Sequence, residues 1–229
     1  MSQLEAALGS RLSALGKTEA ESSNQPQADV TTVPGDRYHD SMLVIMAGLP
    51  GSGKSALARA LAPRCGGVVL DKDPIRATLF GAEVEYTTEQ DDFVVNIMLQ
   101  TAAWFLARNR QRVVILDGRV FSRHAQLHRV TDFAEKLSLD WIVFECVCAE
   151  QTARRRLEQD VAAGVHPAQN RTYALYQAVK KRFEPIPEPK VVVDTERSLE
   201  ECVDQALDAV TRYPLSVSRY RSRRETGDG

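Results

Sequence analysis

The sequence predicts an α/β protein in which a mostly parallel five-stranded sheet lies between two layers of helices. Two observations carry this prediction. Short apolar runs recur along the chain from Met42 onward, and longer stretches with helical character separate them. Parallel strands that are buried on both faces have near-continuous apolar sequences, and each parallel pair needs a crossover connection. Alternating strands and helices therefore indicate a sheet covered on both faces.

The apolar runs place five strands, at residues 42–47, 67–71, 112–117, 139–147 and 190–194. Helices are expected between and after them, at residues 54–63, 88–108, 122–136, 150–162, 170–183 and 198–212. Ligands bind beyond the carboxyl ends of the strands in such open sheets. Polar residues at these ends are therefore the first candidates for a functional site.

Both ends of the chain differ from this α/β domain, which we place at residues 41–213. Residues 1–40 contain a leucine stripe at helical spacing and then a polar segment, which predicts a short helix and a flexible linker. The helix would pack on its own domain or support an oligomer. Residues 214–229 are rich in arginine and predict a flexible tail, either solvated or in contact with RNA or another acidic partner.

Composition indicates a soluble cytoplasmic protein. The 229 residues carry a net charge of −2, so no overall field attracts nucleic acid. The four cysteines lack a disulfide pattern and are expected to be reduced and buried. No apolar stretch approaches the roughly 20 residues that a membrane helix needs. His124 and His128 lack an obvious acidic third ligand, so we expect no zinc site there.

The segment between the first strand and the first helix has the sequence GLPGSGKS, which matches a phosphate-binding loop. Glycines allow backbone N–H groups to converge on phosphate oxygens, and the following helix directs its positive end at them. We expect Lys54 to reach the β- and γ-phosphates of ATP and Ser55 to bind Mg²⁺. The predicted nucleotide ligands are Gly48, Leu49, Pro50, Gly51, Ser52, Gly53, Lys54, Ser55 and Ala56.

Charged residues directly follow the second strand, where an acceptor would lie. An acceptor hydroxyl that attacks the γ-phosphate needs a proton acceptor, and we assign this role to Asp73. The alternative is that Asp73 only caps the helix that Pro74 begins. Asp71 is expected to orient the site, and Arg76 to hold an anionic part of the acceptor.

The third strand ends in Asp117, as in a Walker B strand, and this carboxylate would bind Mg²⁺ through water or orient the acceptor. Arg119 and Arg123 follow it, and we expect them on the substrate side.

Arginines also gather after the fourth strand, in a helix–loop–helix at about residues 150–183 that we interpret as a lid. Arg154, Arg155 and Arg156 span about 200° of a helix and cannot all face one ligand. We expect Arg155 to stabilise the transferring phosphoryl group, Arg156 to bind the nucleotide, and Arg171 to face the substrate.

Together these motifs resemble the broad group of AAA-type predicted ATP-binding kinases, small P-loop kinases that include polynucleotide 5′-kinase, zeta toxin and chloramphenicol phosphotransferase. The resemblance covers residues 42–212 and rests on residues 48–55, 71–76, 116–123 and 182–185. It implies a three-layer α/β/α P-loop NTPase fold. It also implies that Asp73 activates the acceptor, that Arg76 contacts it, and that a lid arginine contacts ATP.

We therefore expect a P-loop kinase that transfers the γ-phosphate of Mg·ATP to a hydroxyl of a small molecule. Three alternatives stay open: a 5′-hydroxyl polynucleotide or RNA kinase, a zeta-toxin-like kinase of a nucleotide sugar, and a partner-regulated ATPase switch. Residues 81–108 show no interleaving of aromatic and basic residues, which argues against nucleic acid as the substrate. The roughly forty residues between the second and third strands offer enough chain for an acceptor pocket, which argues against the switch.

Overall fold

The computed structural model describes residues 41–109, 111–164 and 171–212. The expected N-terminal helix and linker (1–40) and the arginine-rich tail (214–229) lie outside these ranges. The chain divides into two units, Met1–Asp36 and Arg37–Gly229, and all described residues belong to the second. None of the helices in the described ranges combines the length and apolar character that a bilayer crossing needs.

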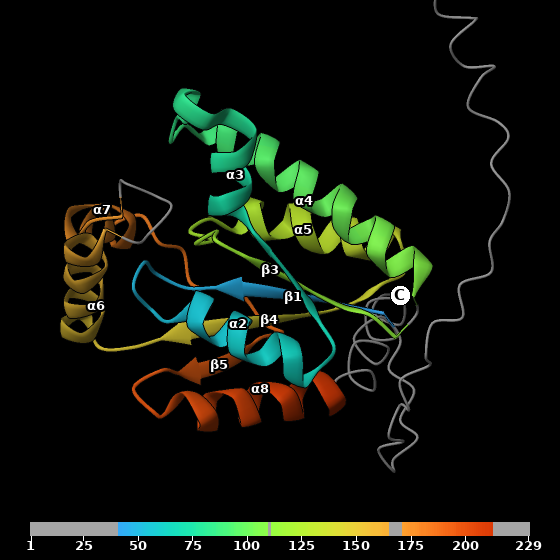
Figure 1. Ribbon diagram of the computed structural model, residues 1–229. Coiled ribbons are helices and arrows are strands. Elements are labelled where there is room, and N and C mark those ends of the chain that lie inside the picture. The colour runs from blue at the N-terminus through green and yellow to red at the C-terminus, as the bar shows by residue number, and fades with distance from the viewer. Residues whose placement is uncertain (1–40, 110, 165–170, 213–229) are drawn as a thin grey trace, which may run out of the picture. The chain divides into compact units, whose positions relative to one another are not determined.

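Five parallel strands form the sheet at the centre of the fold (Figure 1). Their order is β2-β3-β1-β4-β5, and every neighbouring pair is parallel. This confirms the predicted sheet. The strands are β1 (Met42–Ala47), β2 (Val68–Asp71), β3 (Val113–Asp117), β4 (Asp140–Val147) and β5 (Val191–Asp194).

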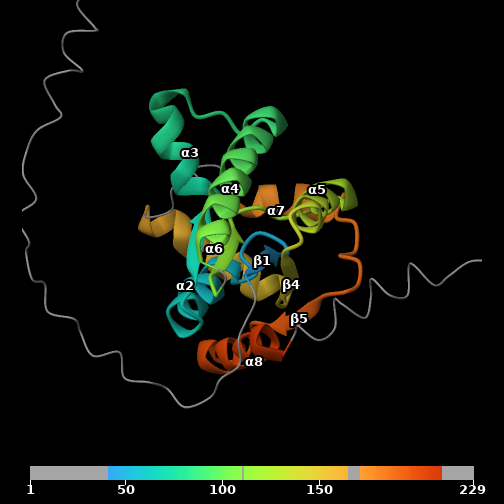
Figure 2. The same ribbon diagram turned by 90° about the vertical axis from the view of Figure 1, so that its right-hand side faces the viewer.

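Helices cover both faces of the sheet, as the three-layer prediction requires. Figures 1 and 2 both show α2 and α8 on one face and α4 and α5 on the other. The helices are α2 (Lys54–Arg64), α3 (Lys72–Phe80), α4 (Thr88–Arg108), α5 (His124–Lys136), α6 (Glu150–Ala163), α7 (Tyr173–Lys180) and α8 (Leu199–Arg212). A short 3₁₀ helix, η1 (Gly81–Glu83), follows α3.

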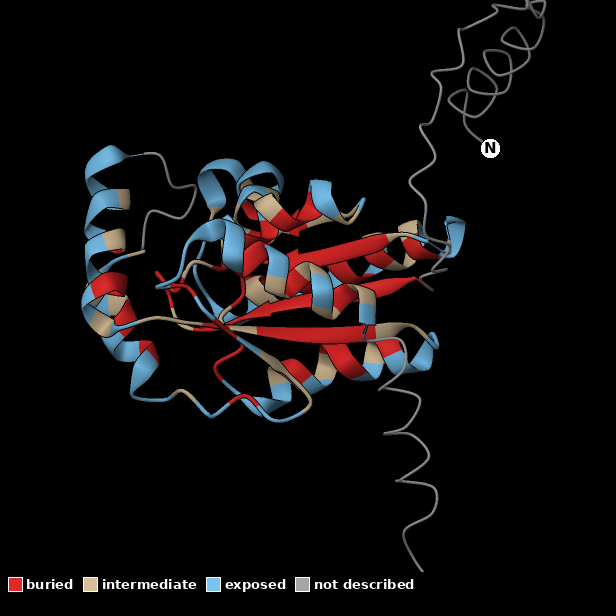
Figure 3. Ribbon diagram, turned by 90° about the horizontal axis from the view of Figure 1, so that it is seen from below, coloured by how far each residue is buried: buried red, intermediate tan, exposed pale blue. Residues whose placement is uncertain are grey.

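The core has two halves, one on each face of the sheet. In β1, Leu43 and Ile45 pack toward α4 and α5, whereas Val44 and Met46 pack toward α2 and α8. This alternation is the two-residue period of a strand. Figure 3 shows the strands buried and the outer sides of the helices exposed. A sheet buried on both faces explains why the strand sequences are almost entirely apolar.

The start of α3 corrects the sequence prediction. Asp71, and not Asp73, is the N-cap of this helix, because its carboxylate accepts a hydrogen bond from the Asp73 amide at 3.1 Å. β2 passes into α3 without a connecting loop, so the helix begins two residues earlier than Pro74 suggested. Pro74 still lies in the first turn, where a missing N–H costs no helical hydrogen bond.

Two helices are shorter than predicted. α5 begins at His124 rather than residue 122, and α7 spans Tyr173–Lys180 rather than residues 170–183. The hydroxyl of Thr172 accepts a hydrogen bond from the Leu175 amide and so caps the start of α7. The cysteine prediction was partly wrong: all four are unpaired, but only Cys146 and Cys202 are buried.

The central strands should dominate stability. We predict that Ile115→Ala, which removes a fully buried β3 side chain, lowers the free energy of unfolding by about 2–5 kcal/mol. Urea unfolding followed by circular dichroism measures this change. The matched control is Val161→Ala on the exposed side of α6, which should change stability by less than about 0.5 kcal/mol. Equal losses in the two variants would contradict the described core.

Candidate active site

The phosphate-binding loop connects β1 to α2 at the carboxyl edge of the sheet. Gly48 has a φ of 130°, and a Cβ atom there would lie 2.4 Å from the Cys146 carbonyl oxygen. Gly53 is the N-cap of α2 in the left-handed conformation and has no side chain to occupy the first-turn amides. The loop therefore presents main-chain N–H groups at a helix N-terminus, which is a binding site for phosphate.

Lys54 lies buried inside this loop. Its ammonium group donates hydrogen bonds to the carbonyls of Gly48 and Leu49, both at 2.8 Å. Burial, and then the charge of Arg171, lowers the pKa of Lys54 from 10.5 to about 8, while the charge of Asp117 opposes this shift. The ammonium also donates to the Ser52 hydroxyl at 3.4 Å, so its hydrogen-bond acceptors are all neutral. A buried ammonium with neutral acceptors gains strongly from an anionic partner.

Two residues from outside the loop hold its shape. The Thr195 hydroxyl, just after β5, lies 3.0 Å from the Ser52 carbonyl and 3.1 Å from the Val147 carbonyl. Arg156 in α6 donates to the Thr195 hydroxyl at 3.0 Å and to the Thr195 carbonyl at 2.8 Å. Its guanidinium also reaches the Gly51 carbonyl at 3.4 Å. The end of β5 and helix α6 thus support the loop.

Two carboxylates lie side by side where β2 and β3 end. Asp71 and Asp117 are paired in register, and Asp117 is almost completely buried. Neither carboxylate oxygen of Asp117 has a hydrogen-bond partner among the described residues. Burial, followed by the charge of Asp117, raises the pKa of Asp71. A bound cation would stabilise two carboxylates that lie so close together and are at least partly buried.

These residues fit a magnesium ion. Ser55 provides a hydroxyl in the first turn of α2, and Asp117 provides unpartnered carboxylate oxygens. No group of three or more His, Cys, Asp or Glu side chains in the described ranges could hold a metal ion. Mg²⁺ commonly uses only one or two protein ligands and completes its shell with water and nucleotide phosphates. Ser55 and Asp117 would hold it in that way.

Two cavities meet at the loop. The first, of about 370 Å³, we call the α8-side cavity. It is lined by Gly51, Gly53, Ser55, Ala56, Leu57, Arg59, Arg156, Asp160, Arg171, Thr195, Arg197, Leu199 and Cys202. The predicted nucleotide ligands Gly51, Gly53, Ser55, Ala56 and Arg156 therefore lie around one space.

The second cavity, of about 200 Å³, we call the α4-side cavity. Its wall includes the predicted acceptor residues Asp73, Arg76, Arg119 and Arg171, together with Lys54 and Pro50. Sequence reasoning gave no role to the residues that complete it, among them Lys72 and Arg182 of the matched segments and Tyr86 and Asp91 outside them. Burial lowers the pKa of Lys72 to about 8. Ser55 and Arg171 line both cavities, which therefore share a boundary.

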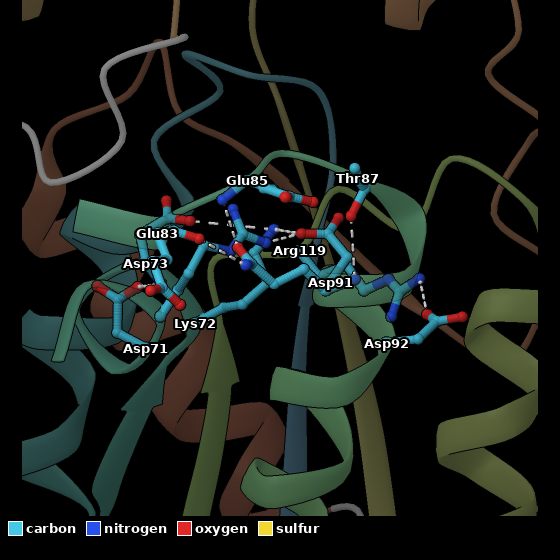
Figure 4. A network of polar contacts seen from close by, with 11 residues as sticks. Asp71, Lys72, Asp73, Glu83, Glu85, Thr87, Asp91, Asp92 and Arg119 are labelled. Atoms are coloured by element: carbon cyan, nitrogen blue, oxygen red, sulfur yellow. Dashed lines mark hydrogen bonds and ion pairs between the residues drawn. The ribbon is translucent and has the colours of Figure 1, made fainter. Parts of the chain in front are cut away.

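A polar network connects α3 to the start of α4 beside the α4-side cavity (Figure 4). Lys72 donates to Asp91 at 2.9 Å, and Arg119 donates to Asp92 at 2.6 Å. Thr87 caps α4 by accepting a hydrogen bond from the Gln90 amide at 3.2 Å. The side-chain carbonyl of Gln90 accepts a hydrogen bond from the Glu85 amide at 2.8 Å, and its amino group donates to the Glu83 carbonyl at 3.2 Å. This network fixes the wall of the cavity.

Some predicted residues lie elsewhere. Arg155 is exposed on α6 and lines neither of the two cavities, and Arg123 is exposed at the N-cap of α5. Their roles toward phosphate or substrate stay predictions. Leu49 and Ser52 are loop residues that, with Gly48, border a smaller cavity of about 100 Å³ beneath the loop.

Comparisons with known proteins agree with this geometry. Residues 43–186 match the family model described as AAA domain. No curated protein sequence matches the chain. The fold is similar to that of a gluconokinase from Sinorhizobium meliloti 1021, with 19% identity and a TM-score of 0.57 over 80% of this chain and 98% of that chain.

Two further solved structures share the fold. The Mycobacterium tuberculosis APS kinase CysC, in complex with AMPPNP and APS, is 17% identical with a TM-score of 0.54, over 74% of this chain and 97% of that chain. Chaetomium thermophilum Kti12, in complex with ADP-AlF3, is 16% identical with a TM-score of 0.55, over 73% of this chain and 98% of that chain. At these identities the likeness concerns the fold alone, and it confirms the predicted three-layer α/β/α P-loop NTPase fold.

The lowered pKa of Lys54 predicts a pH dependence of nucleotide binding. Only the ammonium form pairs with phosphate, and the γ-phosphate is already ionised above pH 7. Affinity for Mg·AMPPNP, a nonhydrolysable ATP analogue, should therefore fall about tenfold between pH 7 and pH 9. Calorimetry across this range measures the change. Lys54→Met should bind the analogue weakly and without this pH dependence, whereas the control Lys72→Met should keep the pH dependence. A pH dependence that persists in Lys54→Met would refute its assignment to Lys54.

The Thr195 hydroxyl should matter for the loop. We predict that Thr195→Val weakens Mg·AMPPNP binding about five- to tenfold, because the Ser52 carbonyl and Arg156 lose a shared partner. Thr131→Val on α5, which also removes a buried hydroxyl that bonds a carbonyl, is the control and should bind normally. Equal affinities in both variants would show that the loop does not need Thr195.

Proposed function

The chain belongs to the AAA domain family, and we propose that it is a kinase that transfers the γ-phosphate of Mg·ATP to a hydroxyl of a small molecule. One observation carries the proposal: two cavities lie on either side of one phosphate-binding loop and share Ser55 and Arg171. A phosphotransferase needs this arrangement, because donor and acceptor must meet at one phosphoryl group.

The α8-side cavity is the proposed nucleotide site. It is the larger of the two and begins at Gly51 and Gly53 of the loop. The loop amides and Lys54 would hold the β- and γ-phosphates, with Ser55 and Asp117 as the residues that hold Mg²⁺. The ion would neutralise charge that develops on the phosphate oxygens. Arg171 would add a positive charge at the boundary where the γ-phosphate lies.

The α4-side cavity is the proposed acceptor site, and Asp73 is its proposed base. Its carboxylate lies on the cavity wall, 3.9 Å from the ammonium group of Lys72. The acceptor oxygen would form a bond to the γ-phosphorus while the bond between that phosphorus and the β,γ-bridging oxygen breaks. Asp73 takes the hydroxyl proton, and ADP leaves with the released electron pair. Asp71 caps the helix and so positions Asp73.

The proposed lid is supported by contacts between α6 and α7. Glu150 in α6 accepts a hydrogen bond from the Tyr173 hydroxyl at 2.6 Å and forms an ion pair with Lys180, also at 2.6 Å. The rings of Tyr173 and Tyr176 are stacked in α7. The two helices are thus connected and would move together when they close over the phosphates and exclude water.

The size of the α4-side cavity supports a small acceptor over a polynucleotide. A space of about 200 Å³ suits a metabolite, sugar or antibiotic fragment better than several stacked nucleotides. Its presence also argues against a partner-regulated ATPase, which needs no second cavity. Among the described residues, its aromatic lining consists of Tyr86 and Phe121. A small-molecule kinase is therefore the function that the geometry supports best.

The proposed base gives a direct test. We predict that Asp73→Asn reduces phosphoryl transfer by at least about 10²-fold and leaves Mg·AMPPNP affinity nearly unchanged, because only the proton acceptor is lost. The assay is transfer of labelled γ-phosphate to pooled metabolites, sugars, antibiotics and 5′-hydroxyl oligonucleotides. Asp132→Asn, an exposed carboxylate on α5, is the control. Undiminished transfer by Asp73→Asn would mean that Asp73 is not the base.

A further inference from the structure

Buried cations dominate the α4-side cavity. Arg76 and Lys72 of α3 and Arg119 after β3 are each less than a tenth exposed, and all three line the space. The Nε atoms of Arg76 and Arg119 are buried and have no hydrogen-bond partner among the described residues. Burying cationic donors without acceptors is unfavourable. The chain has therefore built a strongly electropositive site that its own atoms satisfy only in part.

One carboxylate partly neutralises this site from across the cavity. Asp91, in the first turn of α4, forms ion pairs with both Lys72 and Arg76. Figure 4 shows its carboxylate directed at the α3 residues, beside Arg119. Asp91 itself lines the cavity and is partly exposed, whereas its two cationic partners are buried. A carboxylate in this position fills the place that an anionic ligand would take.

The cationic residues of the α4-side cavity carry more charge than Asp91 can neutralise. The proposed function assigns Lys54 and Arg171 to the nucleotide phosphates, which leaves Lys72, Arg76, Arg119 and Arg182 for the acceptor side of the cavity. Among the described residues, these four cations face two lining carboxylates, Asp73 and Asp91, while Asp92 behind the wall pairs with Arg119 at 2.6 Å, which leaves an excess of one positive charge, and of two once Asp91 is displaced. A neutral sugar or alcohol would leave this excess uncompensated. A phosphate monoester carries close to two negative charges at neutral pH and presents three acceptor oxygens.

We propose that the acceptor already carries a phosphate group beside the hydroxyl that is phosphorylated, and that Arg76, Lys72 and Arg119 bind this group in place of Asp91. The proposal rests on the proposed function and adds the substrate class. Arginine guanidinium groups suit the bidentate recognition of phosphate oxygens. Tyr86, whose ring lies 5.3 Å from the Arg76 guanidinium carbon, would cover the organic part of the acceptor.

Binding of inorganic phosphate tests this site separately from the loop. The full-length protein is first saturated with Mg·AMPPNP, so that the phosphate-binding loop is occupied, and phosphate is then titrated by calorimetry. The wild type should bind one phosphate. Arg76→Met should weaken it by at least about tenfold, because charged hydrogen bonds to the anion are lost. Asp91→Asn should strengthen it several-fold, because the competing carboxylate is gone.

The matched control is Glu89→Gln, which removes an exposed carboxylate from the same turn of α4 outside the cavity. It should bind phosphate like the wild type. Stronger binding in Asp91→Asn alone would show that Asp91 itself competes with phosphate, and that the loss of any nearby negative charge is not sufficient. If Arg76→Met is poorly folded, the comparison of Asp91→Asn with Glu89→Gln decides alone. Equal phosphate affinity in these two variants, or no phosphate binding to the AMPPNP-loaded wild type, overturns the proposal.

Assays of phosphoryl transfer then show which anionic group the acceptor carries. Matched polyols are compared as the free alcohol, the phosphate monoester, the sulfate ester and the carboxylic acid. We expect the phosphate monoester to be used at least about tenfold more efficiently, and Arg76→Met to remove this preference. Preference for the free alcohol would refute this inference while leaving the kinase assignment intact. Failure to bind AMPPNP at all would instead refute the proposed function.

Discussion

The buried ammonium of Lys54 is the interaction on which the rest of the site depends. It lies at the start of α2, holds two loop carbonyls at 2.8 Å, and interacts electrostatically with Asp117, Asp73 and Arg171. These groups lie at or just after the ends of β1, β2 and β3 or, in the case of Arg171, precede α7. Because all five strands are parallel, their carboxyl ends meet at one edge of the sheet. The fold thereby gathers two cations, two carboxylates and a set of amides into one small volume.

The charges divide the site into two chemically different halves. On the α8 side, Arg156 and Thr195 use their polar groups to brace the loop, so that the amides stay ready for phosphate. On the α4 side, Lys72 and Arg76 of α3 form ion pairs with Asp91 of α4. The preorganised loop amides need little reorganisation when phosphate binds, whereas an anion on the α4 side must displace Asp91. The two halves meet at Ser55 and Arg171, where a phosphoryl group would pass between them.

Sequence alone predicted the parts whose signals are local. The loop, the apolar strands and the terminal carboxylate of β3 each lie within a few residues and have their own patterns. Contacts over long separations have no such signal: Thr195 lies 143 residues after its partner Ser52, and Asp91 lies 19 after Lys72. The cap of α3 was misplaced because β2 enters the helix directly, and Pro74 alone could not show where the first turn begins.

The assignment of this site depends on one interaction, in which main-chain amides and Lys54 bind the phosphates of a nucleoside triphosphate. The most direct measurement is calorimetric titration of the full-length protein with AMPPNP in the presence of Mg²⁺. We expect one nucleotide to bind per chain, and binding to be lost or strongly weakened in Lys54→Ala although that variant remains folded. Absence of binding by the wild-type protein, or unchanged affinity in Lys54→Ala, would contradict the account.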